Sequence, residues 1–405
     1  MEFIDGGVAA PQGFTTNGVL SGIKASRTKP DTAVIFSERM CTAAGVFTQN
    51  KVQAECVKLS RSHVSDGKAQ AIIVNSGNAN ACTGEQGAQA ARRMAQAVAN
   101  KLQLQETDVL VCSTGVIGQQ LPVEKIEAKI ADLVSGLSKE GHQAAREAIM
   151  TTDTRYKEAA VETVIGGKTV RLGTMAKGSG MIHINMGTML GFITTDCAIS
   201  ATMLNKALRE SVAGTYNCVS VDGDTSTNDT LLILANGMAG NPEITTENED
   251  YQAFLSALNQ LNTIMAKRIA ADGEGAEHLV ECQVQGAASV EDARILAKSV
   301  ISSNLVKAAF FGKDANWGRI LCAMGYSGGN FTPEKTSVSF VSKAGSIQVF
   351  QLGVPLNFDE ELARKILTED ETCIMVELQD GACSGTAWGC DLTYEYVKIN
   401  GDYRT

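Results

Sequence analysis

The sequence predicts an α+β fold, because compact apolar runs of strand type and longer segments with helical spacing follow one another along the chain. Residues 33–36 (AVIF) and 71–74 (AIIV) are short apolar runs between polar residues, as in buried strands. Residues 249–269 repeat apolar side chains at helical spacing. The 405 residues exceed the roughly 250–300 that one hydrophobic core holds, so we expect more than one domain.

The first half of the chain contains several further elements. Thr83 and Gln86 form a capping-box pattern at the start of a helix that reaches Leu102. The Asn-rich segment 75–80 that precedes it either makes turns or lines a polar pocket with its amides. A strand at 108–112 runs into Ser-Thr-Gly at 113–115. A hydroxyl and a backbone N–H at such a turn are the groups of an oxyanion hole, although a plain turn accounts for the same residues.

The second half of the chain continues with alternating helices and strands. Ser200 is placed to cap a helix, and the polar segment 222–229 joins two apolar runs without the twelfth-position Glu of an EF-hand. Two glycines flank Glu274, which either projects from a sharp turn or is a solvated acid. Aromatic and charged residues at 310–320 are typical of a surface that meets a ligand or a partner, and residues 396–405 are expected to end a strand.

Composition and charge exclude several classes of function. No apolar run approaches the ~20 residues of a membrane span, and the acidic start MEFIDG lacks the basic region of a signal peptide, which favours the cytoplasm. Eleven scattered cysteines favour a reducing compartment, and the four histidines lack zinc-ligand spacing, so no metal is expected. A net charge of −10 without a basic cluster argues against nucleic acid. Small molecules are the expected partners, with no cofactor.

Residues 177–196 carry the most specific hypothesis, which is that the chain cuts itself between Gly187 and Thr188. Gly187 has no Cβ to obstruct attack by the Thr188 hydroxyl on the preceding carbonyl. The freed α-amine has a reference pKa of ~7.7–8.0 and can serve as the general base for the hydroxyl of the same residue. Gly-Thr pairs are common, so these two residues alone leave an ordinary buried loop as the alternative.

The sequence resembles the ornithine acetyltransferase family, the glutamate N-acetyltransferases of the arginine pathway. The resemblance covers essentially the whole chain. It is carried by eight motifs in the order of the family: NSGNANACTG at 75–84, STG at 113–115, MTTDT at 150–154, KGSGMI at 177–182 with TML at 188–190, DGDTSTND at 222–229, DGEGA at 272–276, DANWGR at 314–319 and the terminal residues 400–405.

The resemblance implies a set of site residues and a domain organisation. Thr188 would be the nucleophile, and the Thr114 hydroxyl and Gly115 N–H would form the oxyanion hole. Substrate contacts would come from Thr151, Lys177, Thr188, Glu274, Asn400 and Thr405. The implied fold is a layered αββα core of N-terminal-nucleophile type with a smaller C-terminal α+β domain. We expect an α chain of residues 1–187, a core segment 188–285 and a small domain 286–405, in an assembly of two α and two β chains.

The implied reaction is a ping-pong transfer of acetyl from N2-acetylornithine through Thr188 to glutamate. Acetyl-CoA is a candidate second donor that the sequence leaves open. Two alternatives stay open as well. The first is an amidase or aminopeptidase of the same fold, in which water resolves the acyl-enzyme. The second is a metabolite-binding protein without catalysis.

Overall fold

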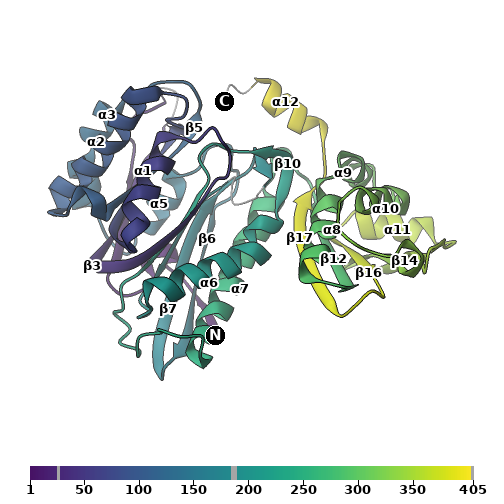
Figure 1. Ribbon diagram of the computed structural model, residues 1–405. Helices are drawn as coiled ribbons and strands as arrows, with labels where there is room; N and C mark the ends of the chain where they lie inside the picture. Colours follow the sequence, from purple (N-terminus) through teal and green to yellow (C-terminus); the bar gives the residue numbers. More distant parts are fainter. Residues whose placement is uncertain (25–27, 184–188, 403–405) are drawn as a thin grey trace.

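The computed structural model describes residues 1–24, 28–183 and 189–402, and it forms two lobes (Figure 1). The larger lobe holds a nine-stranded sheet and a small two-stranded sheet, and the smaller lobe holds a six-stranded sheet. The strands of the larger lobe are β1 (Glu2–Ile4), β2 (Phe14–Val19), β3 (Thr32–Phe47), β4 (Lys68–Asn78), β5 (Val109–Val116), β6 (Lys157–Ile165), β7 (Lys168–Lys177), β8 (Ile182–His183), β9 (Leu190–Thr195), β10 (Ser220–Thr225) and β11 (Thr230–Ala235).

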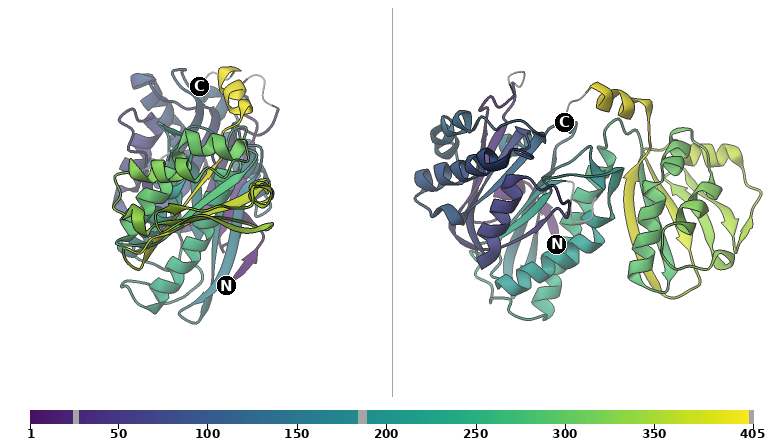
Figure 2. Two further views of the ribbon diagram at one scale, coloured as in Figure 1. Left: turned by 90° about the vertical axis from the view of Figure 1, so that its right-hand side faces the viewer. Right: turned by 45° about the horizontal axis from the view of Figure 1, so that its top comes forward.

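Helices cover the large sheet and separate it from the smaller lobe. In the larger lobe they are α1 (Glu55–His63), α2 (Gly84–Leu102), α3 (Val123–Glu127), α4 (Ile130–Ser135), α5 (His142–Ala148), α6 (Ala201–Gly214) and α7 (Glu249–Ala271). The views agree that α1 and α2 lie on one side of the strands, whereas α6 and α7 lie on the side that faces the smaller lobe (Figures 1 and 2). None of the helices in the described ranges combines the length and apolar character that a membrane crossing requires.

The long strand β3 divides the large sheet into two layers. Its residues 32–37 pair with β2, and its residues 42–47 pair with β11, with an irregularity between Phe36 and Cys41 in its pairing with β4. The strand order is β1-β6-β7-β9-β11-β3-β4-β5, with β2 beside β3. Strands β9 and β11, which follow the predicted cleavage point, therefore lie between β7 and β3, which precede it.

Three apolar clusters show that the layers stack as α, β, β, α. Successive strand residues point to opposite faces, so each strand serves two clusters. Ile72 of β4 packs between the two sheet layers in one cluster with Phe192 of β9. Ile73 faces the cluster that holds the apolar residues of α1 and α2, and Ile193 faces the one that holds those of α6 and α7. The predicted layered αββα core is confirmed.

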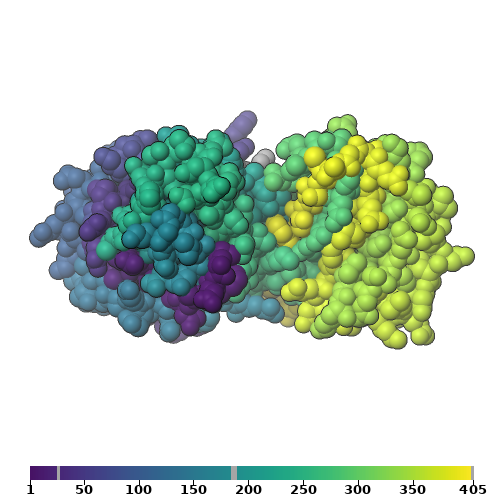
Figure 3. Space-filling view, turned by 90° about the horizontal axis from the view of Figure 1, so that it is seen from below, coloured from purple at the N-terminus to yellow at the C-terminus, as the bar shows by residue number. Residues whose placement is uncertain are grey.

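The smaller lobe is an α+β unit. Its strands are β12 (Leu279–Ala287), β13 (Ser337–Ser342), β14 (Gly345–Gln351), β15 (Val354–Pro355), β16 (Glu371–Glu377) and β17 (Cys383–Cys390), and its helices are α8 (Val290–Ser302), α9 (Asn304–Phe311), α10 (Trp317–Gly325) and α11 (Glu360–Leu367). The two lobes lie side by side in the space-filling view (Figure 3), and one continuous apolar cluster joins α7 to β12 and α8. The predicted divisions 1–187, 188–285 and 286–405 stay a prediction.

Two local expectations are wrong. Residues Tyr394–Asp402 form a helix, α12, and not the end of a strand, and this helix extends back toward the larger lobe (Figure 1). Thr83 does not cap α2, because its hydroxyl donates to Asn80 Oδ1 at 2.8 Å instead. The aromatic residues of 310–320 contribute to the packing of the smaller lobe: buried Phe310 packs edge-on against Phe340, and Trp317 stacks on Phe350. The expectation that this segment meets a ligand or a partner stays a prediction.

Candidate active site

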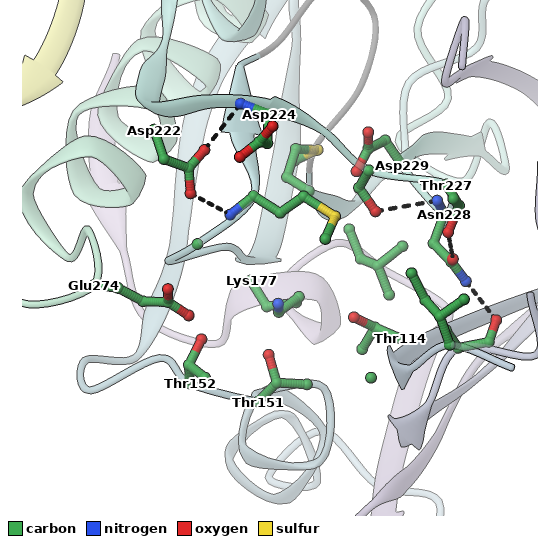
Figure 4. A pocket seen from close by; sticks show the side chains of 18 of the residues that line it. Thr114, Thr151, Thr152, Lys177, Asp222, Asp224, Thr227, Asn228, Asp229 and Glu274 are labelled. Carbon is green, nitrogen blue, oxygen red and sulfur yellow. Dashed lines mark hydrogen bonds between the residues drawn. The ribbon is translucent and has the colours of Figure 1, made fainter. Parts of the chain in front are cut away.

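A cavity of about 340 Å³ lies where the ends of β5 and β7 meet the turn after α7 and helix α12. It is called the site cavity below. Among its lining residues are six that the sequence singled out, which come from five separate segments. They are Thr114, Gly115, Thr151, Lys177, Glu274 and Asn400. Figure 4 labels Thr114, Thr151, Lys177 and Glu274 among them. Gly187, Thr188 and Thr405 lie outside the described residues, and Met189, the residue after Thr188, lines the site cavity.

The Thr114–Gly115 turn is held by close contact between the ends of β4 and β5. Gly115 has φ +131°, and a Cβ on it would lie 2.4 Å from the carbonyl carbon of Gly77, so only glycine fits there. The Asn228 amide donates to the Ser113 carbonyl at 2.8 Å and to the Ala79 carbonyl at 2.6 Å. These bonds tie the residue before the turn to the residue after β4, which is the kind of preorganisation that an oxyanion hole requires.

The Asn-rich segment 75–80 contains the end of strand β4, and its amides do not line the site cavity. The Asn75 Oδ1 atom accepts from Ser113 Oγ at 2.7 Å, and the Asn78 amide donates to the Gln119 carbonyl at 3.1 Å. Asn80 is buried with φ +48° and donates to the Gly87 carbonyl at 2.8 Å. Neither interpretation from the sequence fits, because residues 75–78 are strand and not turn, and these amides bond to neighbouring backbone and side chains without lining the site cavity.

Lys177 ends β7 and lies over a buried carboxylate. Its Nζ lies 3.6 Å from Asp153 Oδ2, while Lys157 Nζ donates to Asp153 Oδ1 at 2.7 Å. Burial alone would raise the pKa of Asp153, but the charges of Lys177 and Lys157 together with hydrogen bonds hold it well below its ordinary value. Lys157 also bonds Asp272, which begins the turn that carries Glu274. The lysine of the site cavity is thus supported by a buried network of alternating charges.

Glu274 reaches the site cavity from the tight turn after α7. Its carboxylate lies against Gly180, where a Cβ would come within 2.2 Å of it. The Glu274 N–H donates to the Ser179 carbonyl at 3.0 Å, and the Asn400 amide donates to Glu274 Oε2 at 2.8 Å. The arrangement agrees with the projecting carboxylate that the two flanking glycines favoured. Helix α12 of the C-terminal segment therefore closes one side of the site cavity.

The polar segment 222–229 supplies lining residues whose role the sequence did not reveal. Asp222 accepts from the backbone N–H groups of Met181 at 2.6 Å and Ile182 at 2.8 Å, which fixes the chain just before residues 184–188. Burial raises the pKa of Asp222, and burial together with the nearby acids raises that of Tyr396. Asp224, Thr227, Asn228, Asp229, Thr152 and Tyr396 also line the site cavity. The acid-rich motif DGDTSTND was the only signal for the four of them that lie in 222–229, whereas Thr152 lies in the motif MTTDT and Tyr396 in the terminal segment.

The site cavity presents one ammonium group and several carboxylates. Lys177 faces the carboxylates of Asp222, Asp224 and Glu274 across the cavity (Figure 4). Such a set fits a substrate that carries both a carboxylate and an ammonium group. The described residues also contain a cluster that suits a metal, Glu277 with His278 and Asp391, but it lies outside the lining of the site cavity.

The layered core and this cavity, with its preorganised turn beside a lysine and carboxylates, are those of an acyl-transferring enzyme. A family model described as the ArgJ family matches residues 15–405. Two relatives called arginine biosynthesis bifunctional protein ArgJ are 51% identical in Symbiobacterium thermophilum and 50% identical in Caldanaerobacter subterraneus, each over the full length of both chains. The chain belongs to the ArgJ family, and it is an acetyltransferase of arginine biosynthesis.

A solved structure agrees with this assignment. The crystal structure of arginine biosynthesis bifunctional protein ArgJ from Bacillus halodurans is 45% identical and matches with a TM-score of 0.51. The match covers 53% of this chain and all of the solved chain. The predicted family, fold class and enzyme class are therefore confirmed, while the roles of the individual site residues stay predictions.

Proposed function

We propose that the chain moves an acetyl group from N2-acetylornithine to glutamate through an acyl-enzyme on Thr188. The observation that carries the proposal is the meeting of Thr114, Gly115, Lys177 and Glu274 in one cavity that also contains Met189. Met189 is joined to Thr188 by one peptide bond. Thr114 and Gly115, proposed as oxyanion donors, and Lys177 and Glu274, proposed as substrate contacts, come from distant parts of the sequence, which supports the proposal.

The first step of the proposal is self-cleavage. The Thr188 hydroxyl attacks the Gly187 carbonyl, the C–N bond breaks, and the peptide nitrogen becomes the free α-amine of Thr188. Water then hydrolyses the ester, which leaves a carboxylate on Gly187 and restores the hydroxyl. The Bacillus halodurans chain supports this step, because its full length corresponds to 53% of this chain, the share expected of a β chain of residues 188–405.

The second step is acetyl transfer. The Thr188 α-amine accepts the hydroxyl proton while the oxygen attacks the acetyl carbonyl of N2-acetylornithine. The Thr114 hydroxyl and the Gly115 N–H donate to the oxyanion, and the proton passes to the departing α-amine of ornithine. The α-amine of glutamate then attacks the acetyl ester, and the Thr188 hydroxyl is regained. Ornithine and N-acetylglutamate are the products.

Charge complementarity gives the substrates one orientation. Lys177 pairs with the α-carboxylate that both substrates carry, and Glu274 balances the side-chain ammonium of the ornithine part. The Asn400 amide, which bonds Glu274, offers a donor to the side-chain carboxylate of glutamate. Thr151 lines the same cavity and offers a hydroxyl. Thr405, outside the described residues, belongs to the same proposal.

Turnover with and without glutamate separates transfer from hydrolysis. We expect ornithine release to depend on glutamate and to match N-acetylglutamate formation. Equal release of free acetate in both assays would show an amidase instead. A denaturing gel tests self-cleavage: wild type should give two chains and Thr188→Ala one. If wild type and Thr188→Ala both give a single uncleaved chain and neither transfers acetyl, the metabolite-binding alternative remains.

Three further parts of the proposal concern donor, assembly and location. Acetyl-CoA serves as a second donor, which is supported by the word bifunctional in the names of the relatives. Assaying N-acetylglutamate formation from acetyl-CoA without acetylornithine tests this directly. The cleaved protein contains two α and two β chains and works in the cytoplasm. Native mass spectrometry tests the assembly, and cell fractionation tests the location.

A further inference from the structure

We propose that His278, Asp391 and Glu277 bind one divalent metal ion of the zinc type at the junction of the two lobes. One ligand atom from each of these side chains lies within 4.8 Å of the other two. The cluster is separate from the site cavity, since none of the three residues lines it. The proposal is therefore independent of the proposed acetyl transfer.

Strand pairing explains why residues so distant in sequence meet. Strands β12 and β17 run antiparallel, and their outermost pair is Leu279 with Cys390 (Figure 1). His278 and Asp391 are the next residues outward on the two strands. Asp391 Oδ1 accepts from the backbone N–H groups of Glu277 at 2.9 Å and His278 at 3.1 Å. The carboxylate is thereby fixed, with Oδ2 left for another partner.

Two buried polar atoms of the cluster have no hydrogen-bond partner among the described residues. They are His278 Nε2 and Asp391 Oδ2, in residues that are 7% and 3% exposed. Buried polar atoms are nearly always paired, and an exception in a native site indicates an ion or water. The other ring nitrogen, His278 Nδ1, lies 3.0 Å from the Glu369 carbonyl. A carbonyl that accepts from Nδ1–H leaves the Nε2 lone pair for a metal, as in most metal-binding histidines.

The chemistry of the three side chains favours zinc over magnesium or calcium. Zinc commonly binds one imidazole nitrogen with carboxylate oxygens, whereas the harder ions prefer oxygen alone. Bond lengths of about 2.0–2.2 Å place tetrahedral ligands roughly 3.5 Å apart, so the exposed Glu277 side chain must turn inward onto the two buried ligands. Water would take the fourth position. No short motif contains these ligands, so the site was not predictable from the sequence pattern.

One nearby positive charge opposes the ion. Lys307 Nζ donates to the Cys390 carbonyl at 2.6 Å and to the Asp391 carbonyl at 3.2 Å. The cluster itself contributes two carboxylates, those of Glu277 and Asp391, which outweigh the one charge of Lys307 and still attract a cation. Thr393 Oγ1 donates to the Gly275 carbonyl at 2.7 Å in the same junction. A bound ion would therefore join the segment after Glu274 to the segment that leads into α12.

Zinc titration of the full chain after removal of metals by a chelator tests the proposal. Calorimetry of wild type should show one Zn²⁺ per chain at this site, and Asp391→Asn and His278→Gln should bind it at least about 100-fold more weakly. Asparagine keeps the oxygen that accepts from the two N–H groups, so the fold is expected to persist, which circular dichroism verifies. His142→Gln, a histidine outside the cluster, is the matched control and should bind zinc like wild type.

Cobalt absorption identifies the ligands, because the exposed thiols of Cys82 and Cys322 also attract zinc. We expect wild type to give a Co²⁺ spectrum without a thiolate charge-transfer band, and Asp391→Asn to lose that spectrum. Equal zinc affinity in wild type and Asp391→Asn would overturn the proposal. So would a wild-type spectrum dominated by thiolate, or no binding of either metal by a folded wild-type chain.

Discussion

Lys177 Nζ lies 3.6 Å from the buried carboxylate of Asp153, which also binds Lys157. The structure thus places a site lysine in the same network as a second lysine that is almost fully buried. We expect Asp153→Asn to lower the free energy of unfolding by about 3–5 kcal/mol, because removing one partner leaves buried charge uncompensated. Urea unfolding of wild type and variant measures this. A loss under 1 kcal/mol would show that water already screens the pair.

The Thr114 hydroxyl is expected to contribute to the rate of acetyl transfer but not to the stability of the fold. Thr114→Ala should lower kcat by ~10²–10³, as loss of one oxyanion donor does, because the alanine has no hydroxyl to donate. The melting temperature should stay near that of wild type, since the turn is held by Gly115 and by the Asn228 amide. Thr114→Ser is the matched control and should recover most of the rate. An unchanged kcat in Thr114→Ala would remove this hydroxyl from the mechanism.

Gly180 leaves the space that the Glu274 carboxylate occupies. A Cβ at residue 180 would lie 2.2 Å from the carboxyl group, which is the end of a flexible side chain and can move away. We therefore expect Gly180→Ala to keep its melting temperature but to raise KM for acetylornithine about tenfold, because the carboxylate leaves the ammonium of the substrate. Gly325→Ala, at a position with open space, is the control. Equal KM values in both variants would contradict the role of Glu274.

His183 gives the protein a defined dependence of stability on pH. Burial, followed by the charge of Lys298, lowers its pKa to about 4, whereas an unfolded chain has a histidine pKa near ~6.5. Between these values the unfolded state binds more protons, so stability falls as the pH falls from about 6.5 toward 4. The free energy of unfolding measured across this range should fall less steeply in His183→Gln. Parallel curves for the two proteins would contradict the prediction.

The regular elements of this fold were predictable because local patterns determined them. As predicted, Ser200 caps α6 through the Met203 N–H, and α7 begins at Glu249. Where a contact with another segment competed with the local pattern, the local pattern did not predict the structure. Thr83 has the residue type of a helix cap, but Asn80 accepts its hydroxyl hydrogen. The terminal segment has strand-like residues, yet it forms α12, whose Asn400 amide donates to Glu274 Oε2.

The site was only partly predictable for the same reason. Motifs identified Lys177 and Glu274, which lie in unusual glycine-rich segments. Asp153 and Asp222 were missed because their function is to hold other residues, through contacts between segments that no spacing reveals. The unpaired atoms of His278 and Asp391 depend likewise on the register of β12 with β17, which the sequence did not specify.

The position of β9 and β11 between β7 and β3 determines the order of folding and the proposed self-cleavage. Each proposed product chain alone would lack the strands that its partner contributes to the middle of the sheet. Each chain made separately would expose strand edges and apolar faces that belong in the middle of the sheet, so the two would not assemble readily on mixing. A cut after residue 187 would instead leave the two chains hydrogen-bonded along two pairs of strands. Folding must therefore be complete before the chain is cut. Cleavage would then mark a mature protein, whose two chains remain associated and carry one new C-terminus and one new N-terminus.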